Sequence, residues 1–570
     1  MLPANRLCPA LCALTLCLAL VPAPTSASRV STLVQAMSLE EKVGQIFMVW
    51  FEGPQVSPDV AALIRERHVG GLILYSAVGN IVDPGQVATL CATAQAQAAA
   101  SDHGVGLLIG VDQEGGPVAR LRDGFTVFPS QMAQAATGRA DLVRQAAAAT
   151  ARELRAIGIN TDFAPVADVN VNPANPVIGI RSFGSNPADV ARLTAAATVG
   201  YGSAGVICTP KHFPGHGDTA VDSHIGLPRV DHDTATLERV DFPPFRAAFA
   251  AGAPAVMTAH VLAPSLEPDG IPATLSRRVL SGALRGRLGF DGVIFTDSLG
   301  MGAVAATYGT AEAAVLALAA GADVLLVGAD ANRPAAERLE ALDRVVEAVR
   351  SGRVPSSRLD AAVSRVIRLK ERFGLLNAAA LTAPPTAGIL VGRQEDAALA
   401  RRIASRSLTA FGPVTPILPL PADVDTLVIR PRLGRDVIDA EAEAAILAWE
   451  GPKSLFVAAD PDTETIAAVV AKARSAHRVA LFITDARKRE GQRRLAEALA
   501  EAIPNSLVLV AAQSPYDVSI LPPSTTKIAI YGETPATFDA LRQGLFMPFR
   551  FTGRCPAALT PERSGTELHF

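Results

Sequence analysis

The stretch Gly106-Leu-Leu-Ile-Gly-Val-Asp112 is an apolar run of strand length that ends in a carboxylate. Similar runs recur along the first part of the chain, at 46–51, 71–75, 161–166, 205–208, 255–260, 292–297 and 323–328. Segments rich in Ala, Leu and Arg separate them, and this alternation predicts buried parallel strands joined by helices. Eight such units are the content of a (β/α)8 barrel.

Polar residues stand at the ends of these runs. Five polar residues lie at or just past the carboxyl end of a run: Asp112, Lys211, His212, His260 and Asp297. Barrel enzymes build their sites from different strands at that face. A doubly wound sheet would also alternate strands and helices, but the count of eight favours the barrel.

A second α/β unit is predicted after the barrel. A helix over 356–371 closes the barrel domain, predicted at 28–376, and the Ala- and Pro-rich stretch 377–388 is typical of a linker. The alternation then restarts in a domain predicted at 389–570, with a helix at 395–407 and strands at 426–429, 454–457, 479–483, 506–510 and 527–531. These elements predict a smaller α/β/α sandwich without a phosphate-binding fingerprint.

The first 27 residues have the pattern of a secretory signal peptide. Arg6 precedes an apolar segment from about Ala10 to Val21, and small residues follow up to Ala27. We therefore expect an exported protein, periplasmic or extracellular, with no integral membrane segment after cleavage. Leu16 is bulky where an acylation site needs a small residue, so soluble export is favoured over a lipid anchor.

The composition of the chain limits the kinds of molecule that the protein is expected to bind. The chain of 570 residues has a formal net charge of −3, and no basic run suggests a nucleic acid. Cleavage would leave Cys91, Cys208 and Cys555, an odd and scattered set that predicts no disulfide framework.

The stretch Lys211-His-Phe-Pro-Gly-His-Gly-Asp-Thr-Ala-Val-Asp-Ser-His224 carries most of the candidate chemistry. It follows an apolar run, and it holds three of the nine histidines of the chain. Gly215 and Gly217 permit a tight backbone path, and Pro214 prevents helix. We interpret the segment as a loop that displays titratable groups at a strand end.

Asp297, Asp222 and His224 could together cleave an acetal. A carboxylate beside a histidine orients the ring and raises its basicity. Asp297 would attack the anomeric carbon, while His224 would protonate the leaving oxygen and later deprotonate water. From the residues alone, Asp297 is equally well interpreted as a helix cap.

A metal site is the rival interpretation of the loop, with His212, His216, Asp218, Asp222 and His224 as candidate ligands. Phe213-Pro-Gly215 separates the first two histidines, so the helical spacing that would pair them is not available. We expect no metal and no cofactor.

The same residues resemble a known family. The loop 211–224 is similar to the signature loop of bacterial β-N-acetylhexosaminidases of glycoside hydrolase family 3. Four other stretches agree: Asp112-Gln-Glu-Gly-Gly116 with Arg120, Asn175–Gly184, Met257–His260 and Thr296–Leu299. The resemblance covers the barrel from Leu39 to about Leu376, and Pro117 stands where the family usually shows a basic residue.

The resemblance implies a retaining mechanism, with Asp297 as nucleophile and Asp222 and His224 as the acid/base pair. It places Asp112, Arg120, Arg181, Lys211 and His212 at positions that bind the hydroxyls of the sugar. It implies as substrate a non-reducing terminal N-acetylglucosamine, typically on a peptidoglycan fragment. The alternatives are a β-glucosidase or a phosphorylase on the same scaffold, and a non-catalytic cell-wall-binding protein.

Overall fold

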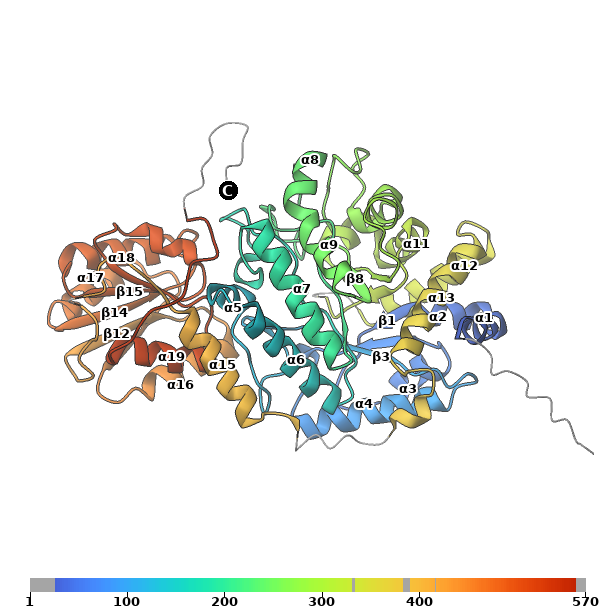
Figure 1. Cartoon of the computed structure of the whole chain (residues 1–570), viewed down its shortest axis with the longest axis horizontal. Coiled ribbons are helices and arrows are strands. Elements are labelled where there is room, and N and C mark those ends of the chain that lie inside the picture. Colours follow the sequence, from blue (N-terminus) through green and yellow to red (C-terminus); the bar gives the residue numbers. More distant parts are fainter. Residues whose placement is uncertain (1–25, 331–333, 383–389, 416, 560–570) are drawn as a thin grey trace, which may run out of the picture.

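The computed structural model describes residues 26–330, 334–382, 390–415 and 417–559. They form a barrel and a smaller α/β unit beside it, and helix α15 (Gln394–Ser407) contacts helices of both (Figure 1). The predicted signal peptide lies outside the described residues except for Ser26 and Ala27, which begin helix α1 (Ser26–Ala36). The α/β prediction of a barrel followed by a sandwich is confirmed.

All eight predicted runs contain a strand of the barrel. The strands are β1 (Phe47–Val49), β2 (Gly71–Ile73), β3 (Leu108–Val111), β6 (Thr161–Asp162), β7 (Ile207–Cys208), β8 (Ala255–Met257), β9 (Val293–Phe295) and β10 (Leu325–Val327). Six pair in parallel in the order β10-β1-β2-β3-β6-β7, and β8 pairs with β9. Parallel bridges between Phe213 and Thr258 and between Phe295 and Val324 join the two sheets. The barrel is therefore closed.

Helices follow the strands and cover the outside of the barrel. They are α2 (Leu39–Gln45), α3 (Pro58–Arg65), α4 (Pro84–Ala99), α5 (Gln131–Ala136), α6 (Ala140–Ala156), α7 (Pro187–Ser203), α8 (Thr234–Thr236), α9 (Phe242–Ala250), α10 (Gly302–Tyr308), α11 (Thr310–Ala320), α12 (Glu337–Arg350) and α13 (Ser356–Arg372). Helix α2 begins with a capping box in which Ser38 and Glu41 each accept from the backbone N–H of the other. Helix α13 matches the predicted closing helix.

The second unit is a six-stranded sheet with helices on both faces. Its strands are β11 (Thr409–Phe411), β12 (Thr426–Pro431), β13 (Lys453–Val457), β14 (Arg478–Ile483), β15 (Leu507–Ala511) and β16 (Thr526–Ala529), in the order β11-β16-β15-β14-β12-β13. Its helices are α16 (Asp436–Leu447), α17 (Thr463–Ala473), α18 (Glu490–Ala502) and α19 (Pro535–Phe546). The five predicted strands are present, and the antiparallel edge strand β11 was not predicted.

Side chains alternate between two cores along these strands, as the two-residue period of a strand requires. On β14, for example, Ala480 and Phe482 pack with α15, α16 and α19, while Val479 and Leu481 pack with α17 and α18. The sheet is therefore buried on both faces.

An apolar contact joins the two units. Met132 and Ala133 of α5 pack with Ala529 and Tyr531 of the second unit. The residue bounds predicted for the domains stay a prediction. The predicted linker contains a short 3₁₀ turn at Ala378–Leu381, and its part from 383 onward lies outside the described residues. Within the described ranges no single helix is long and apolar enough to cross a bilayer; α10 and α11 pass that test only as a pair bent by 103°.

Candidate active site

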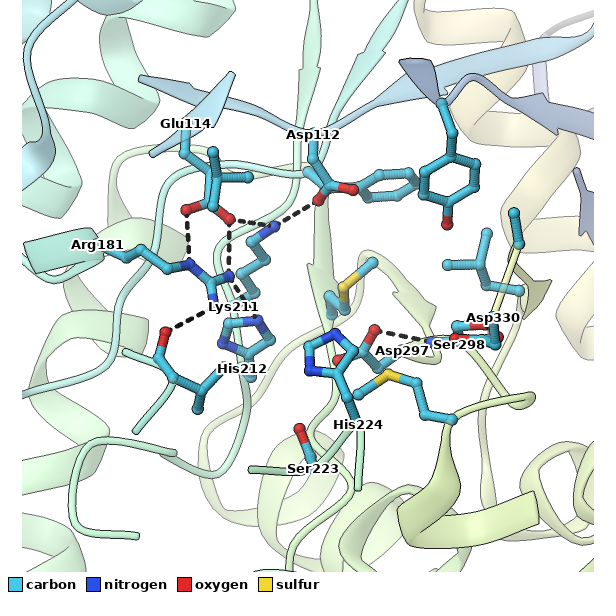
Figure 2. A pocket seen from close by; sticks show the side chains of 18 of the residues that line it. Asp112, Glu114, Arg181, Lys211, His212, Ser223, His224, Asp297, Ser298 and Asp330 are labelled. Carbon is cyan, nitrogen blue, oxygen red and sulfur yellow. Dashed lines mark hydrogen bonds and ion pairs between the residues drawn. The ribbon is translucent and has the colours of Figure 1, made fainter. Parts of the chain in front are cut away.

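A cavity of about 430 Å³ opens at the carboxyl ends of the barrel strands. Seven of the eight predicted site residues line it: Asp112, Arg120, Arg181, Lys211, His212, His224 and Asp297. The eighth, Asp222, is not in the wall but holds the ring of His224. Figure 2 shows Asp112, Arg181, Lys211 and His212 on one side of this pocket, and Asp297 near His224.

Four charged side chains form the side of the pocket on which Asp112 and Arg181 lie. Lys211 Nζ lies 2.7 Å from Asp112 Oδ1 and 2.7 Å from Glu114 Oε1. Arg181 binds Glu114 with two hydrogen bonds, from Nε at 2.9 Å and from Nη2 at 2.8 Å (Figure 2). Two cations and two carboxylates thus hold one another in place, and their remaining donors and acceptors can bind hydroxyl groups.

Glu114 is a site residue that the sequence reasoning did not single out. Burial acts to raise the pKa of its carboxyl, but the charges of Arg181 and Lys211 outweigh burial and hold that pKa far below its usual range. A carboxylate this well paired stays ionised, so it fixes both cations instead of exchanging protons. Its position in the quoted stretch 112–116, two residues after Asp112, was the available signal.

His212 is oriented by a second unpredicted carboxylate. His212 Nδ1 lies 2.7 Å from Asp168 Oδ2, and Asp168 Oδ1 accepts from the backbone N–H of His212 at 3.1 Å and of His216 at 2.7 Å. Asp168 is 1% exposed. One buried carboxylate therefore fixes the ring and the backbone of the segment after β7.

Asp297 follows β9 and is half-buried at the pocket wall. Its Oδ1 accepts from the backbone N–H of Ser298 at 2.8 Å. Burial acts to raise the pKa of the carboxyl, but His212, His260 and this N–H outweigh burial and lower it. Asp297 is thus ionised near neutrality, as an attacking carboxylate must be.

His260 lies behind the pocket and not in its wall. It is 1% exposed, with Nε2 2.8 Å from the Ser298 carbonyl oxygen and Nδ1 3.0 Å from Thr274 Oγ1. Burial lowers the pKa of its ring. The residue supports the backbone next to Asp297.

The surroundings of His224 shift its pKa upward, in the direction opposite to the shift of Asp297. Asp222 Oδ1 lies 2.7 Å from His224 Nδ1 and also accepts from the backbone N–H of His224 at 2.9 Å. This hydrogen bond raises the pKa of the imidazole, although partial burial opposes it. Because Nδ1 is engaged by Asp222, Nε2 is the nitrogen available for proton transfer.

The loop that carries this pair follows a path that needs its two glycines. Gly215 has a φ of +138°, and a side chain at Gly217 would meet the carbonyl oxygen of Val169 at 1.8 Å. His232 braces the loop from outside, with Nε2 3.0 Å from Asp218 and Nδ1 2.6 Å from Asp241. These two carboxylates raise the pKa of His232 to about 10 against the effect of burial, so the ring is a cation at neutral pH.

The proposed metal ligands of the loop have separate partners. His216 binds Thr219 and Ser223, while His212, Asp218 and His224 bind Asp168, His232 and Asp222 respectively. Among the residues that the structure describes, no group of three or more His, Cys, Asp or Glu side chains is placed to hold a metal ion.

Further wall residues were not predicted. Ser298 donates from Oγ to Asp330, and both line the pocket on the side across from Arg181 (Figure 2). Tyr75 follows β2 and lines the same pocket. The predicted Arg120 lines it too, and its buried Nε has no hydrogen-bond partner among the residues that the structure describes.

A family model described as the N-terminal domain of glycosyl hydrolase family 3 matches residues 38–369. The chain belongs to glycoside hydrolase family 3. The match spans all eight barrel strands and therefore every residue placed in the pocket. The chain is accordingly a glycoside hydrolase by family.

Relatives within the family cover one or both units. A β-hexosaminidase A of Pseudoalteromonas piscicida is 36% identical over 360 residues, which are 60% of this chain and 60% of that protein. A β-N-acetylglucosaminidase/β-glucosidase of Cellulomonas fimi is 30% identical over 561 residues, covering 92% of this chain and 95% of the relative. Among solved structures, a family 3 β-N-acetylglucosaminidase from Paenibacillus sp. FPU-7 superposes with a TM-score of 0.84 at 40% identity, over 92% of this chain and 99% of that one.

Proposed function

We propose that this protein is a retaining exo-β-N-acetylglucosaminidase in which Asp297 is the nucleophile and His224, held by Asp222, is the acid and base. The observation that carries the proposal is the pairing in one pocket of a carboxylate with a lowered pKa and an imidazole with a raised pKa. Groups tuned in opposite directions suit the two roles that glycosidic cleavage needs.

The reaction proceeds in two steps. Asp297 forms a bond to the anomeric carbon as the glycosidic C–O bond breaks, and the proton on His224 Nε2 passes to the leaving oxygen. The neutral imidazole then takes a proton from water, whose oxygen displaces Asp297 from the same carbon. Both displacements invert the anomeric carbon, so the configuration is retained and the side chains return to their starting states.

The shape of the pocket supports removal of a terminal sugar. Lys211 and Glu114 are 2% and 5% exposed, and with Asp112 and Arg181 they close the side away from the solvent. Charged donors and acceptors at a closed end bind the hydroxyls of one ring and leave no passage for a longer chain. N-acetylglucosamine is proposed as that ring because the relatives that match this chain are named for it.

The physiological setting is part of the proposal. The predicted signal peptide supports work outside the cytoplasm, periplasmic or extracellular, on N-acetylglucosamine-containing fragments of peptidoglycan. The carbohydrate substrate is the proposed partner, and the reaction as written requires no metal or cofactor.

Hydrolysis of aryl β-N-acetylglucosaminide against aryl β-glucoside tests the proposal, with and without a chelator and phosphate. We expect a strong preference for the acetamido sugar, indifference to the chelator and no sugar 1-phosphate. Asp297→Asn should lower kcat at least about a thousand-fold, as loss of a nucleophile does. Asp291→Asn, at an exposed Asp just before the same strand, is the matched control and should keep full activity.

Three outcomes would contradict the proposal. A preference for the glucoside would favour a β-glucosidase, and release of sugar 1-phosphate would favour a phosphorylase. Binding of wall fragments without turnover would favour a non-catalytic protein.

A further inference from the structure

Arg181 is carried by a 3₁₀ turn, Gly179–Arg181, in the long loop between β6 and α7. Arg181 lines the active-site pocket and also a second cavity, of about 330 Å³, whose far wall comes from 485–488 and 513–516 of the second unit. The turn thus faces open space on two sides. Its backbone therefore depends on the contacts that it makes on its remaining sides.

The second unit packs against the turn from one of these sides. Ile180 is 6% exposed and lies in one apolar cluster with Val518 and Tyr531 of the second unit. Leu559, on the segment that follows α19, packs against the same cluster. The residue just before Arg181 in the chain is thus buried with the help of the second unit.

A segment of the second unit crosses to the barrel just beyond this turn. We call residues 552–559 the crossing segment. Ser185 N–H donates to the carbonyl oxygen of Pro556 at 3.1 Å, and Ala558 N–H donates to Ser185 Oγ at 2.9 Å. Gly184 has a φ of +145°, and a side chain there would meet the carbonyl oxygen of Pro556 at 2.5 Å. The barrel chain at these two residues is therefore shaped to receive the crossing segment.

Hydrogen bonds connect the docked residues to both ends of the turn. Ser182 Oγ donates to the carbonyl oxygen of Asp168 at 2.6 Å and accepts from Gly184 N–H at 3.0 Å. Asn170 N–H donates to the carbonyl oxygen of Gly184 at 2.9 Å, and Asn170 Oδ1 accepts from Gly179 N–H at 3.1 Å. The turn thus begins and ends on residues that are tied to the chain on which the crossing segment docks.

We propose that the crossing segment is a positioning element for Arg181, through which the second unit sets how tightly the pocket binds the terminal sugar. Glu114 fixes the guanidinium from the barrel, and docking on Ser185 fixes the backbone that carries it. The inference rests on the proposed function, since it takes the pocket as the site of that sugar. It gives the second unit a role in binding that requires none of its side chains at the anomeric carbon.

Ser185→Ala tests the inference, because it removes the acceptor for Ala558 N–H and leaves the backbone contact with Pro556. We expect KM for the aryl β-N-acetylglucosaminide and the dissociation constant of N-acetylglucosamine to rise about five-fold, the size of one hydrogen bond. The value of kcat should stay within about two-fold, since a contact made equally in the substrate complex and the transition state changes KM alone. A merely structural loss would act differently, because fewer folded molecules lower kcat and leave KM unchanged.

A double-mutant cycle assigns the effect to Arg181. Arg181→Gln removes the guanidinium, so adding Ser185→Ala to it should leave KM where Arg181→Gln alone puts it. Full additivity of the two changes would show that the crossing segment does not act through Arg181, and it would overturn the inference. An unchanged KM in Ser185→Ala would overturn it as well.

Changes on the crossing segment itself complete the test. Leu559→Ala removes apolar packing from the cluster around Ile180 and should raise KM in the same way. Leu559→Met keeps an apolar side chain of similar volume and should recover the wild-type KM. Thr552→Ala is the matched control, because Thr552 is exposed on the same segment and its hydroxyl donates to the carbonyl oxygen of Arg406 in α15 at 3.4 Å. This control should change neither KM nor kcat.

The inference and the proposed function fail in different ways. A wild-type protein that binds N-acetylglucosamine without hydrolysing the aryl glycoside would count against the proposed function alone, and the dissociation constants of the variants would still decide the inference. A wild-type protein that does neither would overturn both.

Discussion

The two candidate catalytic residues, Asp297 and His224, differ in the groups that surround their titratable side chains. Asp297 sits among two histidines and a backbone N–H, which lower the pKa of its carboxyl against the effect of burial. His224 has an aspartate on one ring nitrogen, which raises the pKa of its imidazole. The two environments therefore favour the ionised form of Asp297 and the protonated form of His224.

The pH profile tests the role of Asp222. In the proposed mechanism, cleavage of the glycosidic bond needs protonated His224, so kcat/KM should fall as the pH rises through the raised pKa of that ring. Asp222→Asn removes the charge that favours the imidazolium, and the alkaline limb of kcat/KM should move to lower pH. Asp231→Asn changes an exposed aspartate further along the chain, paired with Arg229, and should leave the limb in place. An unmoved limb in Asp222→Asn would show that this limb does not report His224.

Local sequence pointed to the proposed catalytic residues and missed two carboxylates, Asp168 and Glu114, that hold other residues of the pocket. Asp297 and His224 stand in dense polar stretches at the ends of apolar runs, where pattern alone draws attention. Asp168 lies 44 residues before its partner His212, and Glu114 lies 67 residues before Arg181. Such pairings arise from barrel closure, which no local pattern encodes.

At the scale of elements, the barrel strands were predictable from the sequence, and the short hairpin and the short edge strand were not. Each barrel strand is buried on both sides, so its sequence is a continuous apolar run. The hairpin of β4 (Gln113–Gly115) and β5 (Val118–Ala119) has polar residues and glycines, and edge strand β11 has three residues. Neither segment is long enough to show the alternation of apolar and polar residues by which a strand is recognised in a sequence.

The loop after β7 depends on a buried ion cluster for its position. His232 is 9% exposed and bridges Asp218 of the loop to Asp241, which is 2% exposed. Its pKa of about 10, against an ordinary value of 6.5, gives stability that is complete below pH 6.5 and is lost as the pH rises toward 10.

His232→Asn should therefore lower the free energy of unfolding by about 3 kcal/mol at neutral pH, because Asp241 stays buried without its cation. It should also lower kcat, since Asp218 no longer holds the loop. Urea denaturation and initial rates measure the two effects. Asp231→Asn breaks only the exposed pair with Arg229 and should cost less than about 1 kcal/mol. Equal costs for the two variants would show that the cluster does not brace the loop.

At the scale of the whole molecule, one tyrosine joins the two units. Tyr531 is fully buried, its Oη lies 2.8 Å from Thr409 Oγ1, and its carbonyl oxygen accepts from Ser130 Oγ at 2.5 Å. Ser130 also caps helix α5 of the barrel. The junction is thus part of a packed core and not a flexible hinge.

Tyr531→Ala should destabilise the protein by about 3 kcal/mol or more, as loss of a buried aromatic ring does. Tyr531→Phe keeps the ring, loses the hydrogen bond to Thr409 and should cost about 1 kcal/mol. Thermal unfolding followed by tryptophan fluorescence reports on both units, because Trp50 lies in the barrel and Trp449 in the second unit. A fall in the transition of the second unit alone would show that the ring does not couple them.

Loops at the strand ends of two separate sheets border one opening. The two walls of this opening therefore belong to different folding units. The barrel loops carry the charged groups of the active-site pocket. The loops after β14 and β15 border the same opening from a different scaffold. Substitutions in those loops can therefore change one wall of the opening without altering any strand of the barrel.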